Sequence, residues 1–186
     1  DCLVEVVRCF DDNNIIHVEG KTDPIRDIEI INVELILSDL EIASNRLVKI
    51  EKKAQTTKEK DALAEYEVLK KCEEALKNNI PLRRIEFDDE ELLLIKNFNF
   101  ITLKPIIYAA NVSEEDCIVG YNTYTNLVNE YAKDDDASVI VMCAKMESQL
   151  AEYNDDDKKA FLSELGIKNS GLDKLIFATY HLLGLQ

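Results

Sequence analysis

The sequence predicts an α/β fold with parallel strands, interrupted by an inserted antiparallel α-helical coiled-coil hairpin. Two apolar segments, 105–111 and 138–143, are predicted as strands and flank a segment of helical periodicity at 122–133. The order strand, helix, strand is typical of neighbouring parallel strands in one sheet. Before them, apolar residues recur at spacings of three and four over two long segments, which is the pattern of two helices packed against each other.

A further strand is predicted at the beginning of the sequence. Residues 2–10 are rich in β-branched side chains, and no initiator Met precedes them, so we expect the sequence to be a segment of a longer protein. A polar loop follows at 11–14. Asp23 can then act as an N-cap and Pro24 can occupy the first helical position, which predicts a helix start.

Two apolar stripes predict the hairpin. The first helix is expected to run to about Ala54. Thr56 is expected to cap the second helix, with Glu59 completing a capping box, and Pro81 prevents this helix from continuing far beyond Asn79. Because the connecting loop is short, the two helices are expected to be antiparallel. The first stripe contains Val33, Ile36, Leu40, Ala43, Leu47, Ile50 and Ala54, and the second contains Ala62, Tyr66, Leu69, Cys72 and Leu76.

The strand at 105–111 is apolar at nearly every position, which predicts burial on both faces. The strand at 138–143 follows the helix at 122–133. The rest of the chain is expected to form three helices: 147–153, 155–165 ended by Gly166, and one from Ser170, with Asp173 at the capping-box position, to Leu183, ended by Gly184.

The amino-acid composition argues against several classes of function. A formal net charge of −15 argues against broad binding to a nucleic-acid backbone, because that binding depends on Lys and Arg. The five cysteines are widely spaced and only two His are present, so we expect neither a zinc site nor a disulfide framework. No apolar run reaches the ~20 residues of a membrane span, and we expect no signal peptide before the first strand. We therefore expect a cytoplasmic location and no membrane partner.

Polar residues follow both central strands. The segment Asn111-Val112-Ser113-Glu114 ends one strand, and Cys143-Ala144-Lys145 ends the next. Ligands of parallel α/β sheets bind at the carboxyl ends of the strands, so we interpret these two segments as half of a nucleotide pocket. The phosphate-binding pattern G-x-x-x-x-G-K-[ST] is absent from the sequence. Gly20-Lys21-Thr22 has the right ending, but Ile15 stands where the first glycine belongs, so we interpret the triplet as a turn before a helix.

Segments spread along the chain match one known family: 6–10, 14–21, 23–31, 103–105, 111–114, 143–147 and 182–186. With these segments the sequence resembles the YchF group of Obg-like ATPases, which belongs to the P-loop GTPase superfamily. The resemblance spans nearly the whole chain and is weakest over 45–99.

This resemblance implies the carboxyl-terminal half of a P-loop GTPase-like domain. It divides the chain into a strand and loop at 1–21, the coiled-coil insertion at 22–99, and the part of the domain with the base-recognition motifs at 100–186. It also implies that the P-loop, the Mg²⁺ ligands and the TGS domain of the family lie outside this sequence. The isolated chain is then expected to be inactive.

The resemblance further implies an ATP site in which GTP binds more weakly. Ordinary GTPases recognise guanine with the motif Asn-Lys-x-Asp; here Val112 stands in place of the Lys and Glu114 in place of the Asp, which is consistent with a preference for ATP. By analogy, Asn111 contacts the N7 edge of the purine and Val112 contacts the base through its backbone. The pocket wall is assigned to Ala144, Lys145 and Met146.

Each assignment has a structural alternative. Asn111 follows a strand, where Asn is a common turn residue. Glu114 is followed by Glu115 and Asp116, and carboxylates at a helix start are favoured by the helix dipole. Lys145 can cover apolar surface with its aliphatic stem or lie in solvent near a helix start.

His17 is the candidate catalytic residue. The family lacks the Gln that positions water in Ras-like enzymes, and His17 lies in a loop that matches the family, so it is suited to orienting the attacking water. Packing of His17 on the helix that begins near Asp23 is the alternative.

Three functions compete. The first, which we favour, is part of an ATP-hydrolysing protein that uses Mg²⁺ and couples its nucleotide state to a macromolecular partner such as the ribosome. The second is a coiled-coil interaction module without nucleotide chemistry, whose tip at 55–60 docks on a large assembly. The third is a stand-alone α/β scaffold. An exposed sheet edge would also favour association between chains.

Overall fold

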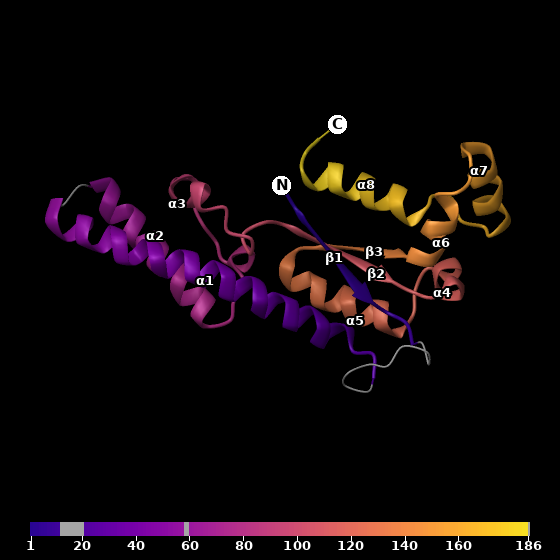
Figure 1. The fold of residues 1–186 in the computed structure, drawn as a ribbon, viewed down its shortest axis with the longest axis horizontal. Coiled ribbons are helices and arrows are strands. Elements are labelled where there is room, and N and C mark those ends of the chain that lie inside the picture. The colour runs from indigo at the N-terminus through magenta and orange to yellow at the C-terminus, as the bar shows by residue number, and fades with distance from the viewer. Residues whose placement is uncertain (12–20, 58–59, 186) are drawn as a thin grey trace. The chain divides into compact units, whose positions relative to one another are not determined.

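The computed structural model describes residues 1–11, 21–57 and 60–185, with the backbone alone at 52–57 and 60 (Figure 1). The chain packs as two compact units. Asp1–Ile28 and Pro105–Gln186 form what we term the sheet unit, and Glu29–Lys104 form the hairpin unit. The expected limits of the insertion, 22 and 99, concern the parent domain and stay a prediction.

A three-stranded parallel sheet forms the centre of the sheet unit. Asn111 at the end of the middle strand pairs with Arg8 on one side and Met142 on the other, so the carboxyl ends of all three strands meet at one edge. The strands, in spatial order, are β1 (Leu3–Arg8), β2 (Ile106–Asn111) and β3 (Ser138–Met142).

Helices cover both faces of this sheet. Helix α5 packs on one face and α8 on the opposite face (Figure 1). Ser113, Asn122 and Ser170 cap helices by accepting a hydrogen bond from the backbone N–H three residues later, and the capping box predicted for Ser170 and Asp173 is present. The helices of this unit after β2 are α4 (Glu114–Val119), α5 (Thr123–Ala132), η3 (Lys133–Asp135), α6 (Ala144–Leu150), α7 (Asp155–Glu164) and α8 (Gly171–Leu182).

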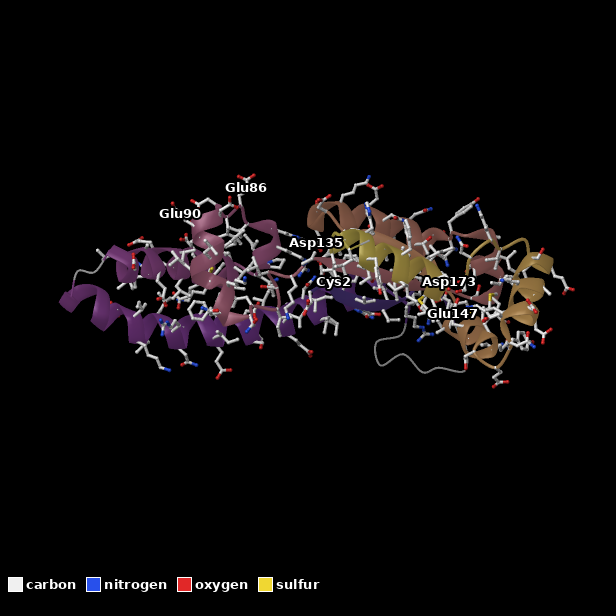
Figure 2. The ribbon with its side chains drawn as sticks, turned by 90° about the horizontal axis from the view of Figure 1, so that it is seen from above. Cys2, Glu86, Glu90, Asp135, Glu147 and Asp173 are labelled. Carbon is white, nitrogen blue, oxygen red and sulfur yellow. The ribbon has the colours of Figure 1, made fainter. Side chains whose placement is uncertain are left out.

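Strand β2 is buried along nearly its whole length, as its unbroken apolar run predicts. Tyr108 lies in the core with Ile106 and Val128, and its hydroxyl donates a hydrogen bond to Asp135 at 2.5 Å. Asp135 is labelled in Figure 2. By contrast, Val4 and Val6 of β1 are exposed. The middle strand is therefore the rigid centre of the sheet, and Asn111 is its last residue.

In the hairpin unit, α1 (Pro24–Thr57) and α2 (Lys60–Lys77) form an antiparallel pair. Ser44 donates to Glu73, and Arg46 donates to Glu65, so later residues of α1 face earlier residues of α2. The predicted stripes supply most of the buried side chains, although Val33 is exposed. Among the described side chains, the two helices contribute to the apolar core of this unit Ile36, Ala43, Leu47, Ile50, Ala62, Val68, Leu69, Cys72, Ala75 and Leu76.

A buried carboxylate fastens the segment that returns from the hairpin. Asp39 on α1 accepts hydrogen bonds from the N–H of Ile101 at 2.9 Å, and from both the N–H and the hydroxyl of Thr102 at 2.7 Å. Leu82 and Phe100 close the apolar core beside it. The short helices of the returning segment are η1 (Leu82–Arg84), α3 (Asp89–Ile95) and η2 (Lys96–Phe98).

The predicted fold class is confirmed, but some helix limits differ. Thr56, expected to cap the second helix, lies inside α1, because residues 55–57 contain neither Gly nor Pro to end the first helix. The helix expected at 147–153 begins at Ala144. The short helix α3 has no counterpart among the predicted elements, and α4 begins where the alternative interpretation of Glu114, Glu115 and Asp116 places a helix start. Within residues 1–11, 21–57 and 60–185, no helix is long and apolar enough to cross a membrane.

Candidate functional site

The candidate site lies at the carboxyl edge of the sheet, where the ends of β2 and β3 come together. The side-chain oxygen Oδ1 of Asn111 accepts a hydrogen bond from the backbone N–H of Ala144 at 2.9 Å. This bond joins the last residue of β2 to the first residue of α6. Since Oδ1 is an acceptor here, the amide nitrogen Nδ2 is the group of Asn111 that can donate to a ligand.

Backbone hydrogen bonds hold this turn from both neighbouring strands. The N–H of Cys9 donates to the carbonyl of Asn111 at 2.8 Å, and the N–H of Val112 donates to the carbonyl of Met142 at 2.9 Å. The main chain at positions 111 and 112 is therefore fixed, which sets the direction of the Asn111 side chain.

Helix α4 begins directly after this turn. Ser113 is its N-cap and accepts from the N–H of Asp116 at 3.1 Å, and Glu114 is its first residue. The Glu114 carboxylate lies 3.4 Å from the ammonium of Lys145, with side chains 41% and 71% exposed. An ion pair this exposed contributes little stability, but it brings a carboxylate from α4 and a cation from α6 to the same edge.

The structure thus brings four predicted site residues to this edge: Asn111, Glu114, Ala144 and Lys145. The other two predicted contacts have buried side chains. Val112 lies in the core under the sheet, and Met146 packs in the apolar cluster with Cys143, Leu150 and Leu162. The role proposed for Val112 was a backbone contact, and with its N–H bonded to Met142 the group that remains for it is the carbonyl.

Cysteine side chains line the inner side of the edge without forming a reactive site. Burial raises the pKa of the Cys9 thiol to about 12, and burial also raises the pKa of Cys117. Thiols with raised pKa values are weak nucleophiles at neutral pH, so these residues act in packing.

Asn122 is a residue of this region that the sequence analysis placed only at a helix start. Its Oδ1 caps α5, while Nδ2 donates to the carbonyl of Cys9 at 2.7 Å and to Asp116 at 2.9 Å. A helix start was the only signal in the sequence, because its two other partners are reached through the fold.

His17 lies in residues 12–20, outside the described part of the chain, so its role stays a prediction. Among the described residues, no group of three or more His, Cys, Asp or Glu side chains is placed to hold a metal ion.

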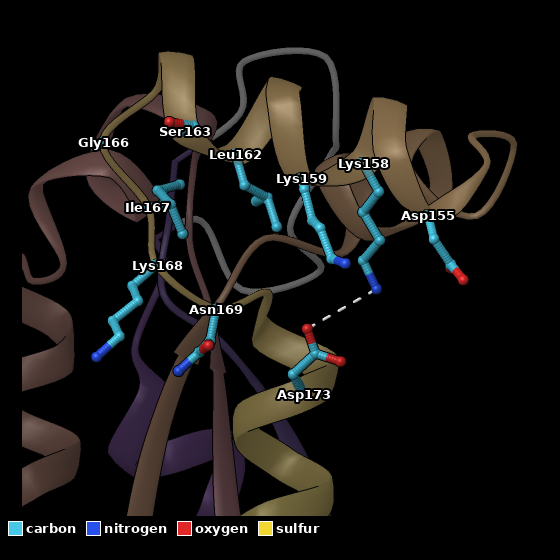
Figure 3. A pocket seen from close by; sticks show the side chains of 10 residues that line it. All are labelled: Asp155, Lys158, Lys159, Leu162, Ser163, Gly166, Ile167, Lys168, Asn169 and Asp173. Carbon is cyan, nitrogen blue, oxygen red and sulfur yellow. Dashed lines mark ion pairs between the residues drawn. The ribbon is translucent and has the colours of Figure 1, made fainter.

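Two further hollows lie on the last helices. One of about 660 Å³ lies beside α7 and the start of α8, with Lys158, Lys159 and Lys168 around it and an ion pair of 3.8 Å between Lys158 and Asp173 (Figure 3). The other, of about 400 Å³, runs along α8 and is lined by apolar and aromatic residues such as Phe177 and Tyr180. No pattern in the sequence predicts either hollow.

The parallel sheet with its polar carboxyl edge, and the helical hairpin between β1 and β2, fit the predicted part of a P-loop GTPase-like domain with a helical insertion. No protein-family model matches the chain. The chain is 48% identical over 186 residues to the ribosome-binding ATPase YchF of Bacillus subtilis (strain 168), and 42% identical over 188 residues to that of Escherichia coli O157:H7. Both matches take in 100% of this chain and 50% of the relative, so the chain spans about half the length of the curated relatives it matches.

A solved structure agrees with these relatives. The YchF GTPase of Schizosaccharomyces pombe superposes with a TM-score of 0.86 at 31% identity, over 98% of this chain and 50% of that one. The predicted resemblance is confirmed: over its whole length this chain is similar in sequence to YchF proteins, and its fold matches that of a YchF GTPase.

Proposed function

We propose that this chain supplies the base-recognition edge and the helical hairpin of a protein that hydrolyses ATP and binds the ribosome. The relatives that match its whole length are named as ribosome-binding ATPases. The observation that carries the proposal is the hydrogen bond from Ala144 to Asn111, because it fixes the Asn111 amide at the edge where parallel sheets bind ligands.

The Asn111 amide has the chemistry to hold a purine. Its Nδ2 hydrogens donate to the N7 acceptor that adenine and guanine share, so Asn111 holds the ring without choosing between them. We assign the discrimination between ATP and GTP to the protein groups that face C6 of the purine ring, where adenine carries an amine donor and guanine a carbonyl acceptor. The Glu114 carboxylate, brought to the edge by α4, accepts from the adenine amine and repels the guanine carbonyl, which favours ATP over GTP.

The walls of this base site come from the segment after β3. The backbone of Ala144 and the aliphatic stem of Lys145 are exposed at the edge, and Met146 supports them from the core. Because the sequence lacks the G-x-x-x-x-G-K-[ST] pattern and spans about half the length of its relatives, we propose that other parts of the parent protein supply the phosphate-binding loop and the Mg²⁺ ligands, and that the isolated chain does not hydrolyse ATP. His17 stays the candidate for orienting the attacking water; unaltered ATP turnover after His17→Ala in the full-length protein would remove that role.

The hairpin is the candidate arm for the ribosome. Its two helices form a separate compact unit with its own core, so it can carry a docking surface without depending on the nucleotide site. We place the contact at the tip near 55–60, and a cytoplasmic location follows from this partner. The alternative function, a coiled-coil interaction module without nucleotide chemistry, uses the same arm.

For the isolated chain, association through the exposed side of β1, with Val4 and Val6, is also expected.

A titration tests the base site. The purified chain is titrated with fluorescent analogues of ATP and GTP, and the same titration is made with Asn111→Ala. Asn78→Ala is the matched control, because the Asn78 amide makes only a local bond to Glu74 on α2. We expect saturable binding that prefers ATP, and about tenfold weaker binding after Asn111→Ala, the effect of one lost hydrogen bond to the base.

The outcomes separate the functions. Weaker binding of both ATP and GTP by Asn111→Ala, but not by Asn78→Ala, supports the proposed base site. Equal binding by all three proteins contradicts it. If no nucleotide binds to the chain or to the full-length protein, while ribosomes bind both, the interaction module replaces the ATPase as the better account.

A further inference from the structure

Asn122 joins three segments that meet at the carboxyl edge of the sheet. One Nδ2 hydrogen bond reaches the carbonyl of Cys9 just after β1, at 2.7 Å, and another reaches the carboxylate of Asp116 on α4, at 2.9 Å. Its Oδ1 accepts from the N–H of Thr125 at 2.8 Å and so caps α5. A helix cap requires only the last of these bonds.

The two Nδ2 bonds lead directly to the base-recognition turn. On one side, Cys9 receives the Asn122 hydrogen bond at its carbonyl and donates its own N–H to the carbonyl of Asn111. On the other side, Asp116 receives the second Asn122 bond and donates its N–H to the Ser113 cap of α4. Asn122 therefore holds the Asn111–Ser113 turn from both of its ends.

The hydrogen bonds of Asn122 to Cys9 and Asp116 are suited to fixing the positions of their partners. Asn122 and Asp116 are both partly buried, and the acceptor at Asp116 is a carboxylate, which makes this hydrogen bond stronger than one between neutral groups. The partners also come from distant parts of the sequence, since Cys9 and Asn122 are 113 positions apart.

We propose that Asn122 is a positioning residue for base recognition: it sets the direction of the Asn111 amide and the placement of α4, and thereby the affinity for ATP. This inference rests on the proposed function. Asn122 does not touch the base itself in this account, and acts through Cys9, Asp116 and the turn between β2 and α4.

The role as a positioning residue can be separated from the role as a helix cap. Asn122→Ser keeps an oxygen that caps α5, because Ser and Asn are comparable N-caps, but it removes both donors. Asn122→Asp also keeps the cap and places a second carboxylate against Asp116. Asn129→Asp is the matched control, since Asn129 lies on the same helix and its Nδ2 makes only a local bond to the carbonyl of Thr125.

The experiment uses the full-length protein that contains this sequence. Steady-state ATP hydrolysis gives KM and kcat, a fluorescent ATP analogue gives the dissociation constant, and thermal unfolding reports the cap. We expect Asn122→Ser and Asn122→Asp to raise both KM and the dissociation constant by about tenfold, with kcat changed less than about twofold. Asn129→Asp should match the wild type.

A double variant supplies the rescue. In Asp116→Asn/Asn122→Asp the donor and the acceptor exchange places, so the bond between α4 and the start of α5 can form again. Partial recovery of ATP affinity relative to Asn122→Asp is the expected result, even where the single variant unfolds at lower temperature.

The possible failures are distinguishable. If the wild-type protein binds no ATP, the proposed function falls and this inference falls with it. If the wild type binds ATP and both Asn122→Ser and Asn122→Asp bind it equally well, only the inference about Asn122 is overturned. A double variant no better than Asn122→Asp would overturn the direct link to Asp116.

Discussion

The hairpin unit and the sheet edge are built from different kinds of interaction. Most of the hairpin core comes from apolar stripes on α1 and α2, whose members repeat within one helix. The sheet edge is held by polar contacts between distant segments, such as Asn111 to Ala144, 33 positions apart, and Asn122 to Cys9, 113 positions apart. Substitutions in the hairpin should therefore change stability first, whereas substitutions at the edge should change ligand affinity first.

The largest expected effect on stability concerns Asp39, a buried carboxylate in the otherwise mostly apolar core of the hairpin unit. Asp39→Ala removes a buried carboxylate and leaves the buried donors of Ile101 and Thr102 without their acceptor. We expect a loss of about 3–5 kcal/mol in the free energy of unfolding, measured by urea denaturation. Glu41→Ala, an exposed position on the same helix, is the control and should change little. A small effect at Asp39 would contradict this prediction, because it would show that the returning segment is held by apolar contacts alone.

The apolar stripe is tested by two leucines of α2. Leu69 has no exposed surface and Leu63 is 44% exposed, so the same change removes core contacts at one position and surface contacts at the other. Leu69→Ala should cost about 2–5 kcal/mol in the free energy of unfolding, and Leu63→Ala well under 1 kcal/mol by the same urea measurement. Equal costs would contradict the packing of α2 described here.

A close approach in the sheet unit gives a third test. A Cβ added at Gly171 would lie 2.5 Å from Cβ of Met142, so the start of α8 can approach β3 only with glycine at this position. The N–H of Gly171 also donates to Glu147 at 2.6 Å (Figure 2). We expect Gly171→Ala to cost about 1–3 kcal/mol in thermal or urea unfolding, with Leu172→Ala as an exposed control. Unchanged stability would show that α8 can move away from the sheet without loss.

The smallest expected effect concerns pH. The Lys77 ammonium, and then the Ser44 hydroxyl, lower the pKa of Glu73 below its usual range. A carboxyl group with a lowered folded-state pKa stabilises the fold above its unfolded pKa of about 4.3, and this contribution is lost as the pH falls through the folded pKa. Because the Lys77 partner is exposed, Glu73→Gln should cost only about 0.5 kcal/mol at pH ~7 and nothing at pH ~2, in urea unfolding at both values. A cost that grows on acidification would have the wrong sign for this account.

Features that depend on residues close together in the sequence could be predicted, whereas contacts between residues far apart in the sequence could not. Apolar periodicity located Leu69 and Cys72 in the hairpin core, and the capping box at Ser170 and Asp173 marked the start of α8. The predicted end of the first helix, before Thr56, was wrong, because α1 continues to Thr57. An apolar stripe does not mark where a helix ends unless Gly or Pro follows.

The candidate site shows the same limit. The sequence located Asn111 and Ala144 at two strand ends, but their hydrogen bond depends on how the strands pair. Ser113 with Glu114, Glu115 and Asp116 carries a clear helix-start signal, yet helix α4 was not among the predicted elements because the same residues also fit a base-recognition motif. The hydrogen-bond partners of Asn122 and Asp39 could not be predicted, because Cys9, Ile101 and Thr102 lie far from them in the sequence and come close only in the folded chain.

The most direct test of the central claim asks where the adenine ring lies. The full-length protein is irradiated with 8-azido-ATP, whose reactive group sits on C8 beside N7, and the labelled peptides are identified by mass spectrometry. Label within 111–114 or 144–146 that unlabelled ATP removes is the result we predict. Label that ATP removes from another region, such as the apolar hollow along α8, would contradict the assignment of the base site to the Asn111 edge.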